Sequence, residues 1–306
     1  MAGFRVAGWG TALPDKTVTN DDLATWLDTS DEWIRERTGI AERRVGDSTT
    51  ALAVEAGRRA LERSPGPVDL VIVATITADQ TTPATASYVQ DALGLRECGA
   101  FDLNAACSGF VYGLVTARGL LATGLRRILL VGAETLSRIT DWDDRRTAII
   151  FADGAAAVVL EATDGEENLL GFDLGSNGAE AGILRADLGG YLRMDGPAVF
   201  AQAVEAMVGS CAASLERAGL SAADVALVVP HQANARILEA GLDGLGIPRE
   251  RVSLVIERFG NTSAASVPLA LADALDRGRL HEGDVVLFVG FGAGMAWASA
   301  VVRWPA

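Results

Sequence analysis

Apolar residues along this chain fall into two patterns, short uninterrupted runs and longer stretches at helical spacing. Uninterrupted runs begin at Leu70, Ile128, Leu227 and Val285, which is typical of strands buried on both faces. Beyond Cys107, apolar residues recur at helical spacing, which predicts a helix there. Strands that alternate with helices in this way predict an α/β fold, with helices layered on buried sheets.

The same order of elements occurs twice. Residues 61–75 resemble residues 215–231, and in both segments a helical stretch precedes an apolar strand. These two strands begin 157 residues apart, and the other two apolar runs repeat at the same offset. Self-similarity at a fixed period indicates a duplicated unit. We therefore predict two halves, residues 1–163 and 164–306, joined at the polar segment 164–168.

One apolar stretch is long enough to raise the question of a membrane span. Residues 285–302 carry no charge, and 18 residues is the lower limit for a transmembrane helix. Gly290, Gly292 and Gly294 interrupt the stretch at its middle. We predict a buried strand, a glycine loop and a second buried strand, and no membrane.

Composition narrows the class of protein. A chain of 306 residues with 49% hydrophobic content buries a large core. The net charge of −14 argues against nucleic acid as a partner, because phosphate binding needs a positive face. Three cysteines form an odd set without metal-type spacing, so neither a disulfide framework nor a metal site is indicated. The N-terminal residues lack the pattern of a signal peptide, and we expect a cytoplasmic protein.

Cys107 lies where a predicted strand, residues 99–103, gives way to the predicted helix. A thiol in the first turn of a helix faces unpaired N–H groups and the positive end of the helix dipole, which favour the thiolate. The small residues around it leave room for a substrate. A lone cysteine in a buried helix is more often a core residue, so this position alone does not establish a site.

His231 and Asn261 are candidates to act with Cys107. His231 follows the apolar strand 225–230, and ligands bind at the ends of strands in open α/β sheets. Asn261 lies in a Gly/Ser/Thr-rich loop ahead of another apolar helix. Taken singly, they would be interpreted as a core histidine and a turn asparagine. Together with Cys107, each at the end of an element, they indicate a site.

The segments around these three residues resemble a known family. NAACSGF (104–110), PHQANARI (230–237) and GNTSAASVP (260–268) are similar to the three signatures of β-ketoacyl-acyl-carrier-protein synthase III. DEWIRERTGI (31–40) resembles that family's coenzyme A entrance motif, and the likeness extends from about residue 3 to 304. The resemblance implies a duplicated, five-layered αβαβα thiolase fold with its site between the halves. It also implies a homodimer and no metal or redox cofactor.

The chemistry that the resemblance implies is a decarboxylative Claisen condensation. A short acyl-CoA and malonyl-acyl-carrier protein give 3-oxoacyl-acyl-carrier protein, either to start fatty-acid synthesis or to prime a polyketide. Cys107 would carry the acyl group, and His231 and Asn261 would stabilise the enolate oxygen formed when CO2 leaves. The backbone N–H groups of Cys107 and Gly294 are candidates for an oxyanion hole, although the glycine loop is equally consistent with a plain turn. Phe151 matches a position that lines the acyl pocket.

Coenzyme A binding is carried over residue by residue. Trp33 would stack on the adenine with Arg37 opposite it, and an aromatic face with a guanidinium suits a flat base. Thr29, Arg145 and Asn234 match further contact positions. Without the surrounding motif, Trp33 would be interpreted as a partly buried helix aromatic, and Arg145 as a surface ion-pair residue.

Two departures from the family pattern affect specificity. The stretch between residues 177 and 200 is several residues shorter than in typical members, which leaves the acyl primer open. The helix after His231 usually carries several basic residues that dock the acidic carrier protein, whereas here Arg236 alone remains. We expect docking by Arg236 together with basic residues outside that helix, and weaker or altered carrier selectivity. The outside candidates are Arg249, Arg251 and Arg258.

Two other functions compete with condensation. An acyltransferase on the same scaffold would move the acyl group to an alcohol or amine, but it would not need the donor Asn261. A non-catalytic partner subunit would not retain cysteine, histidine and asparagine together. A condensation without decarboxylation generally needs an additional carboxylate near the cysteine. Glu134 is a candidate position, but because it ends a buried strand we interpret it as structural.

Overall fold

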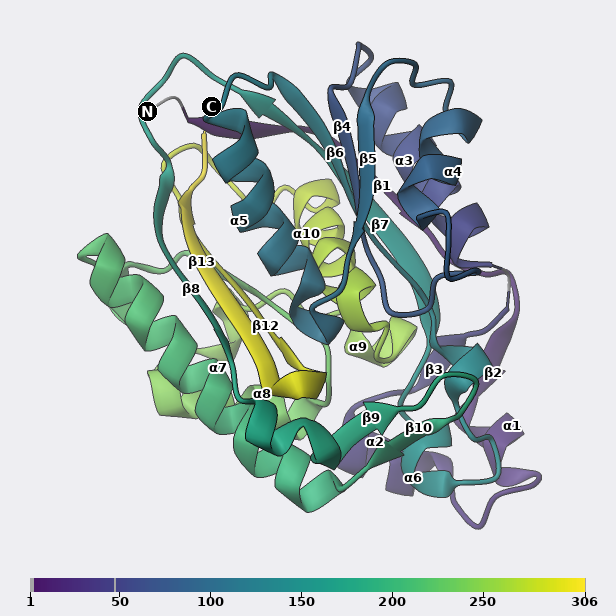
Figure 1. Cartoon of the computed structure of the whole chain (residues 1–306). Helices are drawn as coiled ribbons and strands as arrows, with labels where there is room; N and C mark the ends of the chain where they lie inside the picture. The colour runs from purple at the N-terminus through teal and green to yellow at the C-terminus, as the bar shows by residue number, and fades with distance from the viewer. Residues whose placement is uncertain (1–2, 47, 306) are drawn as a thin grey trace.

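The structure is a computed structural model that describes residues 3–46 and 48–305. Its core consists of two sheets (Figure 1). The larger sheet is five-stranded, in the order β1 (Phe4–Ala12), β7 (Asp153–Ala162), β6 (Arg127–Thr135), β4 (Leu70–Ala74), β5 (Gly99–Leu103). The second is four-stranded, in the order β11 (Leu227–Pro230), β12 (Val285–Gly292), β13 (Ala296–Arg303), β8 (Leu169–Ser176).

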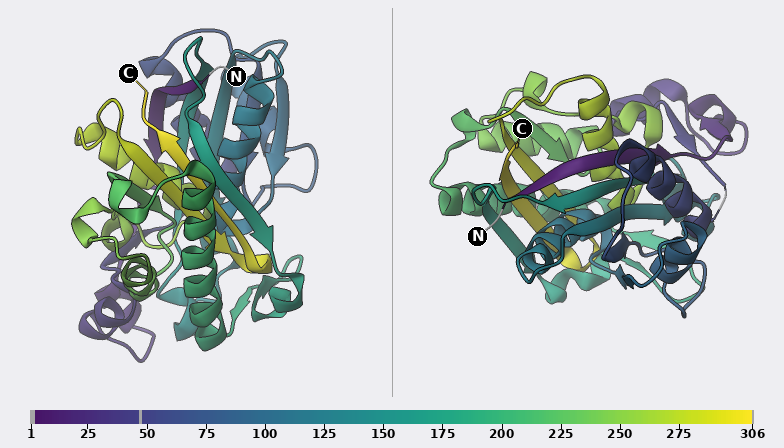
Figure 2. Two further views of the ribbon diagram at one scale, coloured as in Figure 1. Left: turned by 90° about the vertical axis from the view of Figure 1, so that its left-hand side faces the viewer. Right: turned by 90° about the horizontal axis from the view of Figure 1, so that it is seen from above.

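Helices cover both sheets and also fill the space between them (Figure 1 and Figure 2). The outer face of the first sheet packs against α3 (Thr49–Arg63) and α4 (Thr85–Ala92). The middle layer consists of α5 (Gly109–Leu121) and α10 (Ser266–Asp276), which together contact both sheets. The outer layer of the second sheet is α7 (Gly196–Ala218), with α8 (Ala235–Leu245) packed against it. The five-layered αβαβα thiolase-like fold is thus confirmed.

The internal repeat is visible in the strand pairing. β4 pairs in parallel with β6, with Leu70 opposite Ile128, and β11 pairs in parallel with β12, with Leu227 opposite Val286. In each sheet the next strand, β7 or β13, runs antiparallel. The first sheet ends with β7 at Ala162 and the second begins with β8 at Leu169. The boundary between residues 163 and 164 itself stays a prediction.

The start of each half and the end of the chain meet at one end of the molecule, where Figure 1 places both termini. The side chain of Asn168 joins them. Its Oδ1 accepts a hydrogen bond of 2.9 Å from the backbone N–H of Phe4, and its Nδ2 donates to the carbonyl of Phe4 at 2.8 Å. The same Nδ2 donates to the carbonyl of Arg303 at 3.1 Å.

Small elements gather at the other end, away from the termini (Figure 1). They are the two-stranded sheets β2 (Thr17–Thr19) with β3 (Glu42–Arg44) and β9 (Leu184–Ala186) with β10 (Leu192–Met194), and the helices α1 (Asn20–Ala24), α2 (Asp31–Thr38), α6 (Arg145–Ala148) and α9 (Ile256–Phe259). They surround the ends of the long strands, where the candidate site residues lie.

Both long apolar segments belong to the core. Residues 285–302 form β12, a short 3₁₀ turn η7 (Ala293–Met295) and β13, as the sequence predicted. Helix α7 is long and apolar enough to cross a membrane by length and composition. It packs instead along β8, β13 and β12, and buries Met207 and Cys211 completely. It is a core helix.

Candidate active site

Cys107 lies in a 3₁₀ turn, η1 (Ala106–Ser108), that connects β5 to α5. Ala106 adopts the left-handed region with φ 47°, which non-glycine residues rarely do outside functional turns. Gly292, at the end of β12, packs directly against this turn. A Cβ added at Gly292 would lie 2.7 Å from the backbone nitrogen of Cys107 and 2.8 Å from its Cβ. Glycine therefore allows the second half to contact Cys107 in the first.

The environment of the thiol differs from the sequence-based expectation. Cys107 is buried, with 7% of its surface exposed. Burial raises the pKa of the thiol to about 12, a hydrogen bond with the Ser263 hydroxyl lowers it in part, and the charge of Glu134 raises it further. The position at a helix start is thus not enough to predict a thiolate, because burial opposes the charged form of the thiol. The thiol needs a proton acceptor when it reacts.

His231 follows β11 directly, and its backbone N–H donates to the carbonyl of Val289 at 2.7 Å. Its Nδ1 lies 2.6 Å from the Oγ of Ser266, at the start of α10, and the ring of Phe291 packs edge-on with centroids 5.3 Å apart. The imidazole is fully buried, which lowers its pKa to about 3. His231 is therefore neutral at physiological pH, and Nε2 is the nitrogen left to meet a substrate.

Asn261 is fixed so that its amide nitrogen stays available. Its backbone forms a bridge with Phe151, and its Oδ1 accepts a hydrogen bond of 2.9 Å from the N–H of Ser263. No hydrogen-bond partner for its Nδ2 occurs among the residues that the structure describes. With the oxygen occupied, Asn261 presents two N–H donors to a ligand.

These three side chains line one cavity of about 130 Å³. The first half supplies Cys107, and the second supplies His231 and Asn261, so the site lies where the halves meet. Phe151, the predicted acyl-pocket residue, also lines the cavity. The other walls are largely apolar and include Leu184, Met194, Val199, Phe200 and Ile237. Leu184 and Met194 come from the β9–β10 hairpin, in the stretch that the sequence left undefined.

The glycine loop contributes to the wall of the cavity, but Gly292 and Gly294 differ in where they lie. Gly294, the predicted oxyanion donor, lies in η7 with φ 127°, a conformation that favours glycine. Gly292 and Met295 line the cavity, whereas Gly294 is not among the lining residues within the described chain. The role of the Gly294 N–H stays a prediction. Gly292 was predicted to belong to this loop, but its packing against Cys107 was not predicted.

The predicted coenzyme A residues gather beside the cavity. The guanidinium carbons of Arg37 and Arg145 lie 5.2 and 4.7 Å from the centre of the Trp33 ring. Asn234 lines the cavity, accepts from the N–H of Arg236 as the N-cap of α8, and donates to the carbonyl of Arg37 at 3.0 Å. Asn234 thus connects α2, which carries Trp33 and Arg37, to the cavity.

Thr29 and Arg145 belong to the same group. Arg145 hydrogen-bonds the backbone carbonyl of Asp28, and its Nη1 lies 3.7 Å from the carboxylate of that residue. Thr29 is the next residue, and its buried Oγ1 has no partner among the described residues. An unpartnered buried hydroxyl costs free energy unless a ligand or water satisfies it. This favours a polar ligand at the position.

Arg236 is exposed on the first turn of α8 and forms no ion pair within the described part of the chain. The other three candidates for carrier docking are already engaged. Arg249 pairs with Glu239 at 3.1 Å, and Arg258 with Asp273 at 2.6 Å. Arg251 donates to backbone carbonyls.

Sequence reasoning missed two serines, and it did not foresee the contacts of one acid. Ser263 and Ser266 follow Asn261 and contact Cys107 and His231, respectively. Glu134, interpreted as structural, is fully buried and has an Oε1 3.0 Å from the hydroxyl of Ser263. The available signal was the repeat. At its offset of 157 residues, Ser263 matches Ala106 beside the cysteine.

Comparison with known protein families gives two matches. The family model for 3-oxoacyl-[acyl-carrier-protein (ACP)] synthase III matches residues 101–178, which contain Cys107. The model for the C-terminal part of the same family matches residues 215–304, which contain His231 and Asn261.

Individual relatives match along nearly the whole chain. Beta-ketoacyl-[acyl-carrier-protein] synthase III 1 of Bacillus anthracis is 46% identical over an alignment of 306 positions that covers 98% of each chain. The crystal structure of 3-oxoacyl-(acyl carrier protein) synthase III from Pseudomonas aeruginosa PAO1 is 46% identical and covers 99% of both chains with a TM-score of 0.95. The priming β-ketosynthase of the R1128 polyketide biosynthetic pathway is 36% identical, with a TM-score of 0.94 over 99% of this chain and 97% of that one.

Proposed function

Because this chain belongs to the β-ketoacyl-acyl-carrier-protein synthase III family, whose acyl transfer and condensation initiate fatty-acid synthesis, we propose that Cys107, His231 and Asn261 carry out its two half-reactions. The observation that carries the proposal is their meeting in one largely apolar cavity from opposite halves of the chain. Apolar side chains make up most of the walls around Cys107, and the amide donors of Asn261 and Nε2 of His231 are left to meet a substrate.

In the first half-reaction, the sulfur of Cys107 attacks the thioester carbonyl of an acyl-CoA. The thiol proton leaves, a tetrahedral intermediate forms, and the coenzyme A thiolate departs to leave an acyl-enzyme. Backbone N–H groups of Cys107 and Gly294 stabilise the oxyanion in this proposal. Trp33, Arg37, Arg145, Thr29 and Asn234 bind the coenzyme A, and Phe151 contacts the acyl chain.

In the second half-reaction, a malonyl group on the acyl-carrier protein enters the same cavity. Loss of CO2 places negative charge on the thioester oxygen, and the enolate carbon then attacks the acyl group on Cys107. The amide of Asn261 and Nε2–H of His231 stabilise that oxygen. Loss of one such donor typically costs about 3–4 kcal/mol in the transition state, so both residues are required for condensation.

Ser266 sets the tautomer of His231 in this mechanism. Nε2 donates to the enolate oxygen only when it carries the proton, and Nδ1 is then an acceptor. The hydroxyl of Ser266 lies 2.6 Å from Nδ1 and 2.8 Å from the carbonyl of Ser263, so it supplies the matching donor when its single proton turns from that carbonyl to Nδ1. Because burial lowers the pKa of His231 to about 3, the imidazole stays neutral and a fixed tautomer is retained across the working pH range.

The test is a reaction with a panel of acyl-CoAs and malonyl-acyl-carrier protein, followed by mass analysis of the carrier. We expect the carrier to gain the acyl group plus a two-carbon ketide unit, and Cys107→Ala to abolish this product. The panel also identifies the primer. Acylation of Cys107 without any decarboxylated product would contradict the proposal and favour transfer to an alcohol or amine.

Arg236 is proposed as a contact for the acidic carrier protein. Its support is its exposure, its position between Asn234 and Ile237, which line the cavity, and the absence of an ion pair within the described chain. The experiment compares Arg236→Glu with Arg249→Glu, whose arginine already pairs with Glu239. We expect a rise in KM for the malonyl carrier in Arg236→Glu and a smaller one in Arg249→Glu. Unchanged binding in Arg236→Glu would exclude the docking role.

Two further properties are proposed with the activity. We infer a homodimer, supported by β5, which forms the outer edge of the first sheet and has one side without a strand partner in the described chain. Sedimentation velocity tests it. We infer a cytoplasmic location, supported by the free thiols of Cys98, Cys107 and Cys211, which suit a reducing compartment. Fractionation of cells tests that inference.

A further inference from the structure

Glu134 is a buried acid that the two half-reactions leave unused. It lies near the end of β6, with none of its surface exposed. Four donors converge on its carboxylate. The hydroxyl of Thr77 lies 2.5 Å from Oε2 and that of Thr75 3.2 Å, the N–H of Ile76 is 3.2 Å from both oxygens, and the hydroxyl of Ser263 is 3.0 Å from Oε1. This set suits a carboxylate, which accepts hydrogen bonds without donating any.

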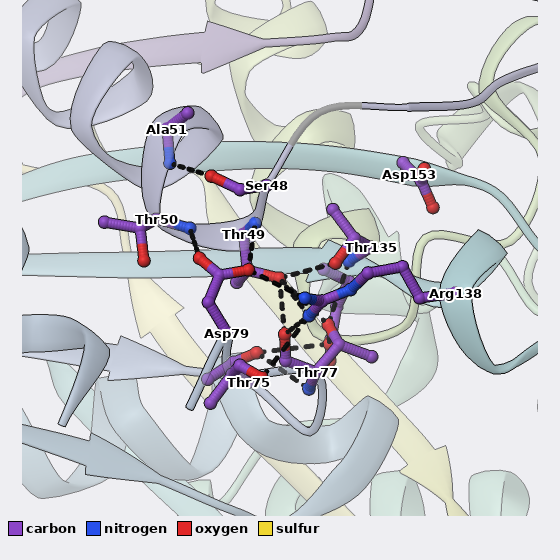
Figure 3. A network of polar contacts seen from close by, with 12 residues as sticks. Ser48, Thr49, Thr50, Ala51, Thr75, Thr77, Asp79, Thr135, Arg138 and Asp153 are labelled. Carbon is purple, nitrogen blue, oxygen red and sulfur yellow. Dashed lines mark hydrogen bonds and ion pairs between the residues drawn. The ribbon is translucent and has the colours of Figure 1, made fainter. Parts of the chain in front are cut away.

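The threonines behind Glu134 are oriented by a second ring of contacts. Figure 3 shows Thr49, Thr77 and Thr135 with their hydroxyls gathered beside the guanidinium of Arg138. The Thr49 hydroxyl donates to the carbonyl of Thr77 at 2.5 Å. The hydroxyl of Thr135 lies 2.7 Å from the Thr49 hydroxyl. The hydroxyl of Thr77 accepts from the N–H of Thr135 at 2.8 Å, so its own proton is directed to Glu134.

Ser263 connects Glu134 to the nucleophile. Its hydroxyl donates to Oε1 of Glu134 at 3.0 Å, and it lies close enough to the sulfur of Cys107 to lower the pKa of that thiol. A left-handed backbone, φ 48°, and the 2.9 Å bond from its N–H to Asn261 fix this position. A hydroxyl has one proton, so it donates to one of its two neighbours and accepts from the other. That is the arrangement of a one-step proton relay.

We propose that Ser263 and Glu134 take the thiol proton of Cys107 during acyl transfer. The inference rests on Cys107 as the nucleophile of the proposed function. As the sulfur attacks the acyl-CoA carbonyl, the S–H bond breaks and its proton passes to the oxygen of Ser263. The proton of Ser263 passes at the same time to Oε1 of Glu134. The C=O π bond opens as the sulfur–carbon bond forms, so the negative charge moves to the former carbonyl oxygen. The products are this oxyanion, a neutral carboxylic acid on Glu134 and an unchanged serine.

The relay conserves charge in a buried site. Before transfer, the negative charge is on Glu134 and raises the pKa of Cys107. After transfer that charge is gone from Glu134, so no second anion forms beside it. The hydrogen bonds reverse direction and none is lost, because Glu134 then donates to Ser263 and Ser263 to the sulfur.

Glu134 is a better proton acceptor than His231. Burial raises the pKa of Glu134 to about 7, partly opposed by its hydrogen bonds to Thr77, Ile76, Ser263 and Thr75. Burial lowers the pKa of His231 to about 3, which makes the imidazole a weak base. A base is most effective when its pKa is near the working pH. This divides the chemistry, since Glu134 serves acyl transfer and His231 serves decarboxylation.

Other ionisable groups near the relay are few. Arg138 hydrogen-bonds the carbonyl of Thr77 and pairs with Asp79 at 2.8 Å. Thr77 therefore lies between Arg138 and Glu134. Asp153, on the neighbouring strand β7, is bonded to Ser137. On the side of the cavity, the titratable lining residues are Cys107 and His231.

The experiment measures alkylation of Cys107 by iodoacetamide between about pH 5.5 and 9.5, read for each cysteine by peptide mass. The wild-type rate should rise with pH through about 7, as Glu134 loses its proton and becomes able to accept one. Glu134→Gln should remove this step and react at least about tenfold more slowly near pH 8. An electrostatic or structural role predicts the opposite, because removal of a neighbouring negative charge favours the thiolate.

Three further variants make the result decisive. Ser263→Ala leaves Glu134 in place and should lose the same step, which also carries the test if Glu134→Gln does not fold. The double variant should be no slower than either single one, since both interrupt one path. Thr140→Val removes a buried hydroxyl that donates to the carbonyl of Leu136 at 2.9 Å, outside the contacts around Glu134, and its profile should match wild type. A Glu134→Gln profile equal to wild type, or faster, would overturn the relay.

Acylation by acetyl-CoA, followed by intact mass, separates the two proposals. A wild-type Cys107 that accepts acetyl while Glu134→Gln accepts it at the same rate refutes the relay alone. A wild-type Cys107 that is neither alkylated nor acylated refutes the nucleophile, and with it the function on which the relay rests.

Discussion

Two turns of nearly the same shape contact each other where the halves meet, η1 (Ala106–Ser108) and η6 (Ser263–Ala265). They are 157 residues apart, and their first residues have φ 47° and 48°. Each turn is preceded by an asparagine whose Oδ1 accepts an N–H two residues on, at 3.3 Å for Asn104 and 2.9 Å for Asn261. The backbone of the duplicated unit is therefore kept in both copies.

The side chains on the two turns have different tasks. Ala264 stands in the second turn where Cys107 stands in the first. Asn104 is exposed, whereas Asn261 is buried at 5% exposure and lines the cavity. His231 has an alanine as its counterpart in the first half. The two copies thus share a backbone conformation, but one copy supplies the proposed nucleophile and the other supplies the proposed hydrogen-bond donors.

The halves also pack on each other's turns, which explains why the backbone was kept. Gly292 of the second half packs on Cys107, and Gly132 of the first half packs on the second turn. A Cβ added at Gly132 would lie 2.4 Å from the carbonyl oxygen of Ala264. Each turn fits only against the bare backbone of the opposite half, so neither can change shape alone.

Replacing Cys107 with alanine makes the first turn chemically like the second, and it should have the largest effect. Acylation and condensation should fall by at least about 10⁴-fold, because no other group forms the thioester. Decarboxylation of a malonyl thioester should persist, since His231 and Asn261 remain. Intact mass and CO2 release measure the two steps. Loss of both would contradict the division of tasks between the halves.

Asn261→Ala and Asn104→Ala compare the two asparagines directly. Asn261→Ala should reduce decarboxylation by about 10²–10³-fold through loss of one oxyanion donor, with acylation of Cys107 less affected. Asn104→Ala is the matched control, since its side chain makes the same turn contact without facing the cavity. Equal effects of the two variants on decarboxylation would show that both asparagines act through the turn.

Gly292→Ala and Gly132→Ala test the packing on the turns. Each added methyl meets backbone atoms of the opposite half, so each should lower the free energy of unfolding by about 1–3 kcal/mol. Gly292→Ala should also slow acylation, because the methyl displaces Cys107. Gly178→Ala, which has open space around it, serves as the control in urea unfolding. Normal stability of Gly292→Ala would mean that the contact is loose.

Ser266→Ala should have the smallest effect of the four. It removes the hydroxyl 2.6 Å from Nδ1 of His231, and both tautomers of the imidazole then become populated. We expect decarboxylation to slow by roughly tenfold, the equivalent of about one hydrogen bond. Acylation of Cys107 is the internal control and should stay near the wild-type rate. The counterpart of Ser266 in the first half is a glycine, Gly109, where no histidine needs a partner.

Much of this architecture was predictable from the sequence. The apolar runs at Leu70, Ile128, Leu227 and Val285 all form strands, because uninterrupted apolar residues with polar ends have few other stable arrangements in a chain of this size. The repeat then implied two sheets. The family signatures predicted that Cys107 lies in one site with His231 and Asn261 from the second half.

Protonation states, and contacts between residues of the two halves, could not be predicted from the sequence in the same way. The position of Cys107 at a helix start suggested a thiolate, but its pKa depends on burial by both halves, which no local pattern reports. Glu134 looked structural because its partner Ser263 is 129 residues away and reaches it only through a left-handed turn. Spacing along the chain identifies the turns, whereas hydrogen bonds between them require the fold.

The bridge that Asn168 makes between Phe4 and Arg303 has a consequence for how the chain tolerates being cut. The seam, the first strand and the last strand lie together at the end of the molecule away from the cavity. A polypeptide opened at residues 164–168 and closed by a short linker between its present ends would keep both sheets and the helices between them. A circular permutant opened at the seam should therefore fold into an active protein. Two fragments divided at the seam and expressed separately should likewise assemble into one.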